Sequence, residues 1–388
     1  MARALMIGSA GRLGALLCFV SLLAPQGSEA QVPPPSPSGQ AAPPEYLKRA
    51  QEVVRAAMKP PTFADIRPST PAPPFKPGLR IAVILATARS TGAQLQARGV
   101  REGAAAVGWT TVEFDGQGTN QGRLAAFRTV LTQKFDGIVL VAMDQRVVGD
   151  AMRDAHAQKI PVVSTMAGNM AGSEPDQVFA NAGMDDLQEG RKVGSWIVAD
   201  AAASGAKVNA LLFLNPVNRT VEQRDAGVQA VLKECADCKV AAAETYTSAE
   251  VFQTVPQRTQ ALLQLHPQVN YIMIDVGAYA VYVVQSVKQL GAGFEKKVKL
   301  ISFDCVPDEV ARIVARDVQW ACEGAASEAS GWAAIDELNR ALNRQPRAGN
   351  TVPVQLITLD NYAGVTTPAV GYTGPYDYKV EWRKYWGK

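Results

Sequence analysis

Histidine and net charge are both scarce in this sequence. Only two of the 388 residues are histidine, which excludes His-rich metal sites and the HExxH signature of zinc proteases. With 39 basic and 36 acidic side chains, the formal net charge of +3 gives no electrostatic case for binding nucleic acid or an anionic membrane surface. No P-loop or GxGxxG motif follows the first predicted strand, so we expect no metal and no cofactor.

A catalytic pair is also missing from the sequence. Neither His156 nor His266 has a Ser or Cys nucleophile at a recognisable spacing. His156 falls in a charged helical stretch, and His266 ends a predicted helix before Pro267, where an imidazole suits the helix dipole. We therefore do not expect an enzyme.

No apolar run is long enough to be a confident membrane span. The run at residues 13–24 is shorter than the ~20 residues that crossing a bilayer requires. It follows Arg3 and Arg12 and precedes small residues at Ser28 and Ala30, which is typical of a secretory signal cut after Ala30. We therefore predict that residues 1–30 are a signal peptide.

Proline is concentrated in one stretch. Residues 31–78 contain 13 of the 24 prolines, a composition that builds no packed core and predicts a semi-rigid linker. Within it, residues 45–58 have helical spacing of apolar side chains. This short helix either packs on the body of the protein, presents a small docking surface, or is only a marginal helix in a linker.

From residue 79 onward, apolar runs alternate with amphipathic segments. Strand, helix, strand at this spacing indicates parallel sheets with right-handed crossovers, and the pattern runs twice. We therefore predict an α/β protein with two doubly wound lobes. The predicted strands are residues 80–85, 111–115, 137–141, 162–165 and 177–180, then 208–214, 239–246, 271–275, 299–303 and 318–322.

Several segments resemble the sugar-type periplasmic binding proteins of the ribose-binding and lactose-repressor-like superfamily. "GLRIAVIL", "FDGIVLVAMD" and "AQKIPVVSTMAG" are similar to the first lobe of that family, and "KLISFDCVPDEVARI" and "GWAAIDELNRAL" to the second lobe and its return. The likeness covers roughly residues 79–360, and no helix-turn-helix precedes it. It implies a type I periplasmic binding fold, with lobes joined by a three-stranded hinge near residues 183–186, 323–325 and 350–353.

The resemblance also implies domain boundaries, a location and a role. The first lobe is expected at residues 79–183 plus 324–351 and the second at 184–323 plus 352–388. The implied protein is a monomeric periplasmic receptor of an ABC-type importer that closes on a small sugar-like or less polar solute and docks with a membrane permease. The alternative is a sensor protein that presents its ligand to a membrane kinase or chemoreceptor.

The polar groups that hold sugar in this family are mostly replaced here. Met166 and Ala167 fall where the family has an Asp-Arg pair, Glu222 where it has an Arg, and Val276 where it has an Asn. Asp304 keeps the family carboxylate. The resemblance therefore implies a pocket that is more apolar than that of a pentose or hexose binder.

Ligands of doubly wound folds lie beyond the carboxyl ends of the strands, so residues just after the strands are candidates for contact. Each candidate has a structural alternative as a helix cap, a satisfied loop residue, a hinge residue or a core residue. The candidates are Arg89, Asp144, Met166, Asn215, Phe252, Asp275, Tyr279, Asp304 and Glu323.

Four cysteines remain after the predicted cleavage, and an even number in an exported protein favours disulfides. Cys235 and Cys238 follow a predicted helix and precede a strand, which favours a structural bridge over a redox pair or half of a zinc site. Cys305 and Cys322 end neighbouring strands. They either pair with each other or remain as two buried thiols.

Overall fold

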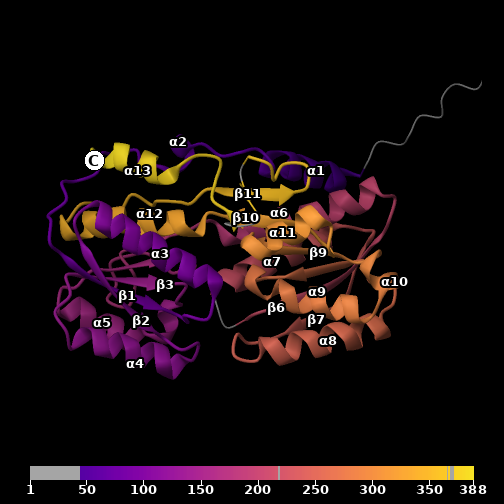
Figure 1. Cartoon of the computed structure of the whole chain (residues 1–388), viewed down its shortest axis with the longest axis horizontal. Coiled ribbons are helices and arrows are strands. Elements are labelled where there is room, and N and C mark those ends of the chain that lie inside the picture. Colours follow the sequence, from indigo (N-terminus) through magenta and orange to yellow (C-terminus); the bar gives the residue numbers. More distant parts are fainter. Residues whose placement is uncertain (1–43, 217–218, 365, 368–370) are drawn as a thin grey trace, which may run out of the picture. The chain divides into compact units, whose positions relative to one another are not determined.

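The strands form two separate, mainly parallel sheets in the computed structural model, which describes residues 44–216, 219–364, 366–367 and 371–388 (Figure 1). The predicted signal peptide and the first part of the predicted linker lie outside these residues. The two sheets confirm the α/β class with two doubly wound lobes. We call the part built on the first sheet the first lobe and the part built on the second sheet the second lobe.

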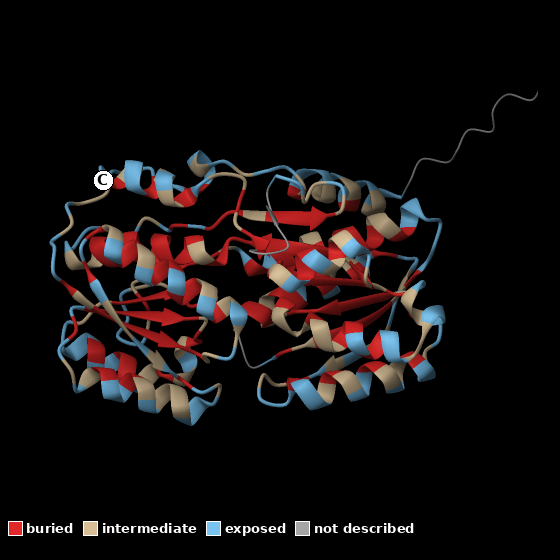
Figure 2. Ribbon diagram, viewed as in Figure 1, coloured by how far each residue is buried: buried red, intermediate tan, exposed pale blue. Residues whose placement is uncertain are grey.

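The first sheet has the strand order β2-β1-β3-β4-β5, and all its neighbours are parallel. Its strands are β1 (Arg80–Leu85), β2 (Thr110–Asp115), β3 (Gly137–Val141), β4 (Val162–Thr165) and β5 (Ala180–Ala182). β3 and β4 are buried along their whole length, as expected for parallel strands covered on both faces (Figure 2). β5 begins only at Ala180, so three of the four residues of the predicted strand at 177–180 lie outside it.

The second sheet has the order β11-β10-β9-β8-β6-β7, and only β10 and β11 are antiparallel. Its strands are β6 (Val208–Leu214), β7 (Cys238–Thr245), β8 (Tyr271–Ile274), β9 (Lys299–Asp304), β10 (Gln319–Ala325) and β11 (Val354–Thr358). β11 was not predicted as a strand. A short pair, β12 (Thr366–Thr367) with β13 (Gly371–Tyr372), completes the strands of the described residues.

Helices cover both faces of each sheet. Alternate residues of β1 pack into different clusters, Ile81 with α3 and α12 on one face and Ile84 with α4 and α5 on the other. The second sheet is covered by α6 and α7 on one face and by α8 and α9 on the other. The helices are α1 (Glu45–Ala57), α2 (Phe63–Ile66), α3 (Thr91–Ala106), α4 (Asn120–Leu131), α5 (Gly149–Ala157), α6 (Asp186–Ala203), α7 (Arg219–Glu234), α8 (Val251–Leu265), α9 (Ala280–Gln289), α10 (Ala292–Glu295), α11 (Pro307–Ala315), α12 (Ser327–Leu342) and α13 (Tyr378–Trp386).

Three segments cross between the lobes side by side. They connect β5 to α6, β10 to α12, and α12 back to β11. Val352 N donates to Gly183 O at 3.1 Å, and Ala326 N donates to Pro353 O at 3.0 Å. Because these bonds join segments distant in the sequence, the crossings form one hydrogen-bonded hinge, as the fold class implied.

The C-terminal helix departs from the predicted division of the chain. Residues 352–388 were assigned to the second lobe, and β11 does lie in its sheet. By contrast, α13 packs on α12 and shares the first lobe's core cluster. Trp386 stacks on Trp332 of α12 with ring centroids 5.3 Å apart. The two indole rings bury each other, and this places the end of the chain with the first lobe.

The segment before β1 runs along both lobes. Ala50 and Ala57 of α1 are buried in the second lobe's cluster with α6, so this helix packs on the body. Farther along, the indole Nε1 of Trp109 in the first lobe donates to Lys76 O at 2.7 Å. The carbonyl groups of the proline-rich stretch after α1 lie outside helices and strands. Side chains of the body donate hydrogen bonds to them, and this holds the stretch against the protein.

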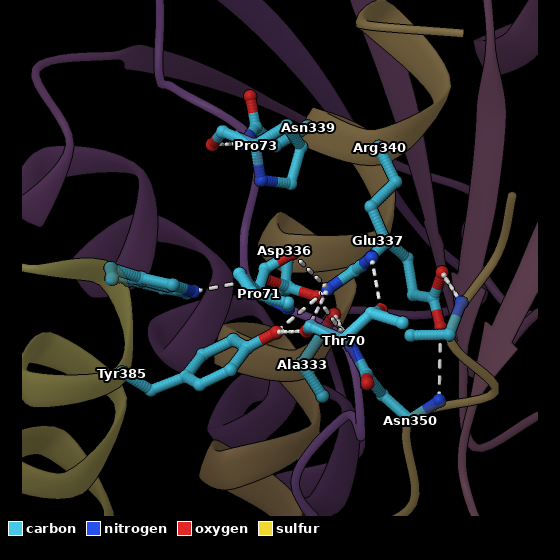
Figure 3. A network of polar contacts seen from close by, with 12 residues as sticks. Thr70, Pro71, Pro73, Ala333, Asp336, Glu337, Asn339, Arg340, Asn350 and Tyr385 are labelled. Carbon is cyan, nitrogen blue, oxygen red and sulfur yellow. Dashed lines mark hydrogen bonds and ion pairs between the residues drawn. The ribbon is translucent and has the colours of Figure 1, made fainter. Parts of the chain in front are cut away.

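Arg340 of α12 ties this N-terminal segment to the C-terminal helix (Figure 3). Its Nε donates to Asp336 Oδ2 at 2.8 Å, and its Nη2 donates to Thr70 O at 3.1 Å and to Tyr385 Oη at 2.7 Å. Trp386 Nε1 donates to the other oxygen of Asp336 at 3.0 Å. One buried guanidinium thus forms hydrogen bonds with three segments of the chain: α12, the N-terminal segment and α13.

We expect Arg340→Met to lower the free energy of unfolding by about 3–5 kcal/mol, because it leaves the buried Asp336 carboxylate without its cation. Urea unfolding measures the loss. Arg347→Met, which changes an exposed arginine just beyond α12, is the matched control and should stay within about 0.5 kcal/mol of the wild type. Equal losses in the two variants would contradict this account of Arg340.

Candidate functional site

A cavity of about 100 Å³ lies between the lobes, at the carboxyl ends of the strands. The first lobe contributes the loops after β1, β3 and β4 and residues of α3 and α4. The second lobe contributes the loops after β6, β7 and β8, the end of β9 and the first turns of α7. This is the position where doubly wound sheets hold their ligands. We call it the interlobe cavity.

Four of the nine predicted ligand residues line the interlobe cavity: Met166, Asn215, Tyr279 and Asp304. Their direct role in binding stays a prediction. The other five lie elsewhere. Arg89 is exposed, and Phe252 is 55% exposed on the surface of α8, because the buried face of that helix is formed by Val251, Val255 and Leu263. Asp144, Asp275 and Glu323 are buried but are not part of the cavity wall.

Asp304 forms the wall of the cavity together with Arg224. Arg224 Nη2 donates to Asp304 Oδ1 at 2.9 Å, and its Nε lies 3.3 Å from Asp186 Oδ1. Arg224 is buried, and its guanidinium stacks over the ring of Phe303 with Cζ 4.7 Å from the ring centroid. Burial raises the pKa of Asp186 to about 7, although Arg224 favours its ionised form.

Arg224 was not among the predicted ligand residues. The resemblance to the family aligned its sugar-binding arginine with Glu222, so an acidic residue was expected where the family has a basic one. The structure brings Arg224, two residues later on α7, to the cavity instead. Its position in the first turns of a helix that follows a buried strand was the signal available.

Glu222 takes part in a contact between the lobes. Arg146, in the short helix η1 (Gln145–Val147) after β3, places Nη2 2.6 Å from Asp144 Oδ2 and 3.1 Å from Glu222 Oε1. Arg219 N of α7 also donates to Asp144 Oδ2, at 3.2 Å. Asp144 is therefore occupied by groups from both lobes, which gives it a role in holding them together.

Asp275 lies at the centre of a buried polar cluster behind the cavity wall. It accepts hydrogen bonds from the Tyr246 hydroxyl and from Asn215 N, and it lies beside Asp225. Burial and the neighbouring carboxylate raise the pKa of Asp225, so the two acids keep a proton between them at neutral pH. The cluster fixes the backbone of Asn215, and Asn215 itself lines the cavity.

Glu323 belongs to the hinge. It lies on β10 with Lys192 Nζ 3.6 Å from its Oε1, and Lys192 also bonds Glu189 at 2.7 Å. Burial raises the pKa of Glu323 well above its ordinary value, with the nearby Glu189 carboxylate acting in the same direction. Glu323 was predicted either to contact the ligand or to be a hinge residue, and its neighbours fit the hinge.

All four predicted cysteines are paired. A disulfide joins Cys235 to Cys238 in the turn between α7 and β7, and another joins Cys305 to Cys322. The first confirms the structural bridge and leaves no thiols for a zinc site. The second resolves the open choice at Cys305 and ties the residue after Asp304 to the neighbouring strand β10.

A larger hollow of about 670 Å³ lies under α1, against α6 and α7. The second lobe and the N-terminal segment line it, with no contribution from the strand ends of the first lobe.

None of the helices in the described residues has both the length and the apolar character needed to cross a bilayer.

The sequence matches the family model described as a periplasmic binding protein domain over residues 81–346. No curated protein matches it. Similar solved structures include a glucose-galactose binding protein from Geobacillus stearothermophilus (16% identity, 74% of this chain and 100% of that chain, TM-score 0.63). A 5-methylthioribose transporter solute binding protein from Thermotoga lettingae (17%, 80% and 94%, 0.66) and a Caulobacter myo-inositol binding protein (18%, 73% and 94%, 0.63) are also similar.

The Asp225–Asp275 pair predicts a pH dependence of stability. The folded pair keeps a proton that the unfolded aspartates lose above about pH 4. The folded state therefore binds more protons, and stability falls as the pH rises from 5 to 7, by up to about 1.4 kcal/mol per pH unit for one proton.

Asp225→Asn mimics the protonated side chain, so we expect a smaller loss of stability between pH 5 and pH 7 than in the wild type. Urea unfolding at the two pH values measures the difference. Asp154→Asn, at an exposed position of α5, is the control and should keep the wild-type slope. An unchanged slope in Asp225→Asn would show that the buried pair holds no extra proton.

Proposed function

Because the chain belongs to the periplasmic binding protein family, we propose that it is the substrate-binding component of an ABC importer. It acts in the periplasm, as a monomer, and delivers a small organic solute to a membrane permease. It binds without catalysing a reaction. The predicted family is confirmed, and its fold supports such a role, whereas the importer, the partner and the ligand are proposals.

One observation carries the proposal: the interlobe cavity is lined by both lobes, and three hydrogen-bonded segments connect those lobes. A ligand that contacts both walls favours the closed arrangement, because only contacts that differ between open and closed states shift that balance. The Arg146–Glu222 contact at 3.1 Å adds a direct ion pair between the lobes.

The wall of the interlobe cavity combines apolar and polar side chains. Met166 and Ala167 line or adjoin the first-lobe side of the cavity, and Val276 lies on the second-lobe side. These side chains offer no hydrogen bonds to sugar hydroxyls. Asp304 and Asn215 provide polar contacts at the second-lobe wall. We therefore propose a solute with one less polar part and one part that donates hydrogen bonds.

Native mass spectrometry of protein purified from its host tests the proposal. We expect one small molecule per chain, recovered unchanged after release. Asp304→Asn and, separately, Tyr279→Phe should weaken its rebinding about tenfold or more, because each removes a polar contact of the wall. Asp308→Asn, an exposed neighbour on α11, is the control and should bind normally. Conversion of the molecule, or full binding by both cavity variants, would refute this function.

A further inference from the structure

Arg123 is a cation in the interlobe cavity that has no anionic partner. It lies in the first turn of α4 and reaches the cavity from the first-lobe side. The hydrogen bonds that its side chain donates are long and therefore weak. Nε lies 3.4 Å from Ala86 O, and Nη1 lies 3.5 Å from Asn120 Oδ1. No ion pair joins it to a carboxylate anywhere in residues 44–388 that the structure describes.

The path of the Arg123 side chain is built into the fold. A Cβ atom added at Gly116, in the loop after β2, would lie 2.7 Å from Arg123 Cγ and 2.7 Å from Leu85 O. Any larger residue at Gly116 would therefore displace either the arginine stem or the end of β1. The glycine leaves the space through which Arg123 extends to the cavity.

The acids near Arg123 are occupied by other groups. Asp144 accepts from Arg146 through both carboxylate oxygens and from Arg219 N. Asp115 Oδ1 accepts from Ala88 N and from Gln117 N, each at 2.8 Å. Burial lowers the pKa of Arg123, and the charge of Asp144 only partly opposes this. A partly buried cation without a charged partner is stabilised by an anion that enters beside it.

The opposite wall contains a carboxylate that is paired with a cation. The carboxylate of Asp304 is fixed by Arg224 at 2.9 Å and faces the same cavity, so that end accepts hydrogen bonds from a ligand. Met166 and Val276 add apolar surface to the same cavity. The cavity therefore has an unpaired cation in its first-lobe wall, a carboxylate paired with Arg224 in its second-lobe wall, and apolar surface from both lobes.

We infer that the solute is a small carboxylic acid whose carboxylate pairs with Arg123 and whose hydroxyl groups donate to Asp304. The inference rests on the proposed function and specifies its ligand class. A neutral sugar would leave the guanidinium without an anion. An acid would instead bridge the two lobes, since its charged end touches the first lobe and its donor end touches the second.

Matched pairs of compounds test the inference directly. The probes are D-galactose with D-galacturonate, D-glucose with D-glucuronate, and lactamide with lactate, each measured by thermal shift and by calorimetry. The accurate mass of the molecule that copurifies with the protein shows independently whether it carries an acid group. We expect that molecule to be an acid, and an acid probe that binds to exceed its neutral partner about 100-fold or more in affinity.

Two substitutions on α4 locate the anion. Arg123→Gln should weaken binding of the acid about 100-fold or more, and Arg123→Lys should restore part of it. The unliganded Arg123→Gln protein should melt at the wild-type temperature or above, because the cation it lacks has no partner. Arg128→Gln changes an exposed arginine on the same helix and should bind like the wild type.

The outcomes separate the two proposals. A copurified neutral molecule, a neutral probe that binds as tightly as its acid, or an acid that binds Arg123→Gln undiminished would overturn the acid inference and leave the receptor role intact. Binding of no small molecule, neither a copurified one nor any probe, would overturn the receptor role and the inference with it.

Discussion

The architecture of the site depends on one buried guanidinium. Arg224 lies out of water between Asp186 and Asp304, and a buried cation is stable only beside opposite charges. Asp186 begins α6, Arg224 lies on α7, and Asp304 ends β9. The ion pairs therefore fix the second-lobe wall to the segment that leaves the hinge. Asp304 also holds a left-handed φ of +76°, a conformation that its surroundings must stabilise.

The two walls of the cavity are prepared differently. In the second lobe, Arg224 and Asp304 satisfy each other before any ligand arrives. In the first lobe, Arg123 has only long contacts, and Met166 offers an apolar surface. Ligand binding therefore completes the first lobe more than the second. The Arg146–Glu222 bond adds to closure, but both residues are partly exposed, and solvent screens such a pair.

Much of the fold could be predicted from sequence because buried parallel strands are continuous apolar runs. The segments at β1, β3 and β4 have that pattern, and Asp304 directly follows another such run. The second disulfide was open because pairing depends on strand neighbours: β9 and β10 lie side by side with Ser302 opposite Cys322.

Tertiary packing decides positions that the sequence pattern leaves open. Phe252 is apolar, yet the orientation of α8 leaves it at the surface. α13 buries Trp382 and Trp386 in one cluster with Trp332, a contact between segments that the sequence pattern does not pair. Glu222 and Arg224 are two residues apart on α7, so their side chains point in different directions around the helix axis. Arg224 therefore faces the cavity, whereas Glu222 contacts the first lobe.

Small-angle X-ray scattering measures whether the two lobes close around a ligand. The radius of gyration should be smaller for protein carrying its copurified solute than for the same protein after unfolding, dialysis and refolding. Returning the solute should restore the smaller value. An identical radius of gyration with and without the bound solute would contradict the account.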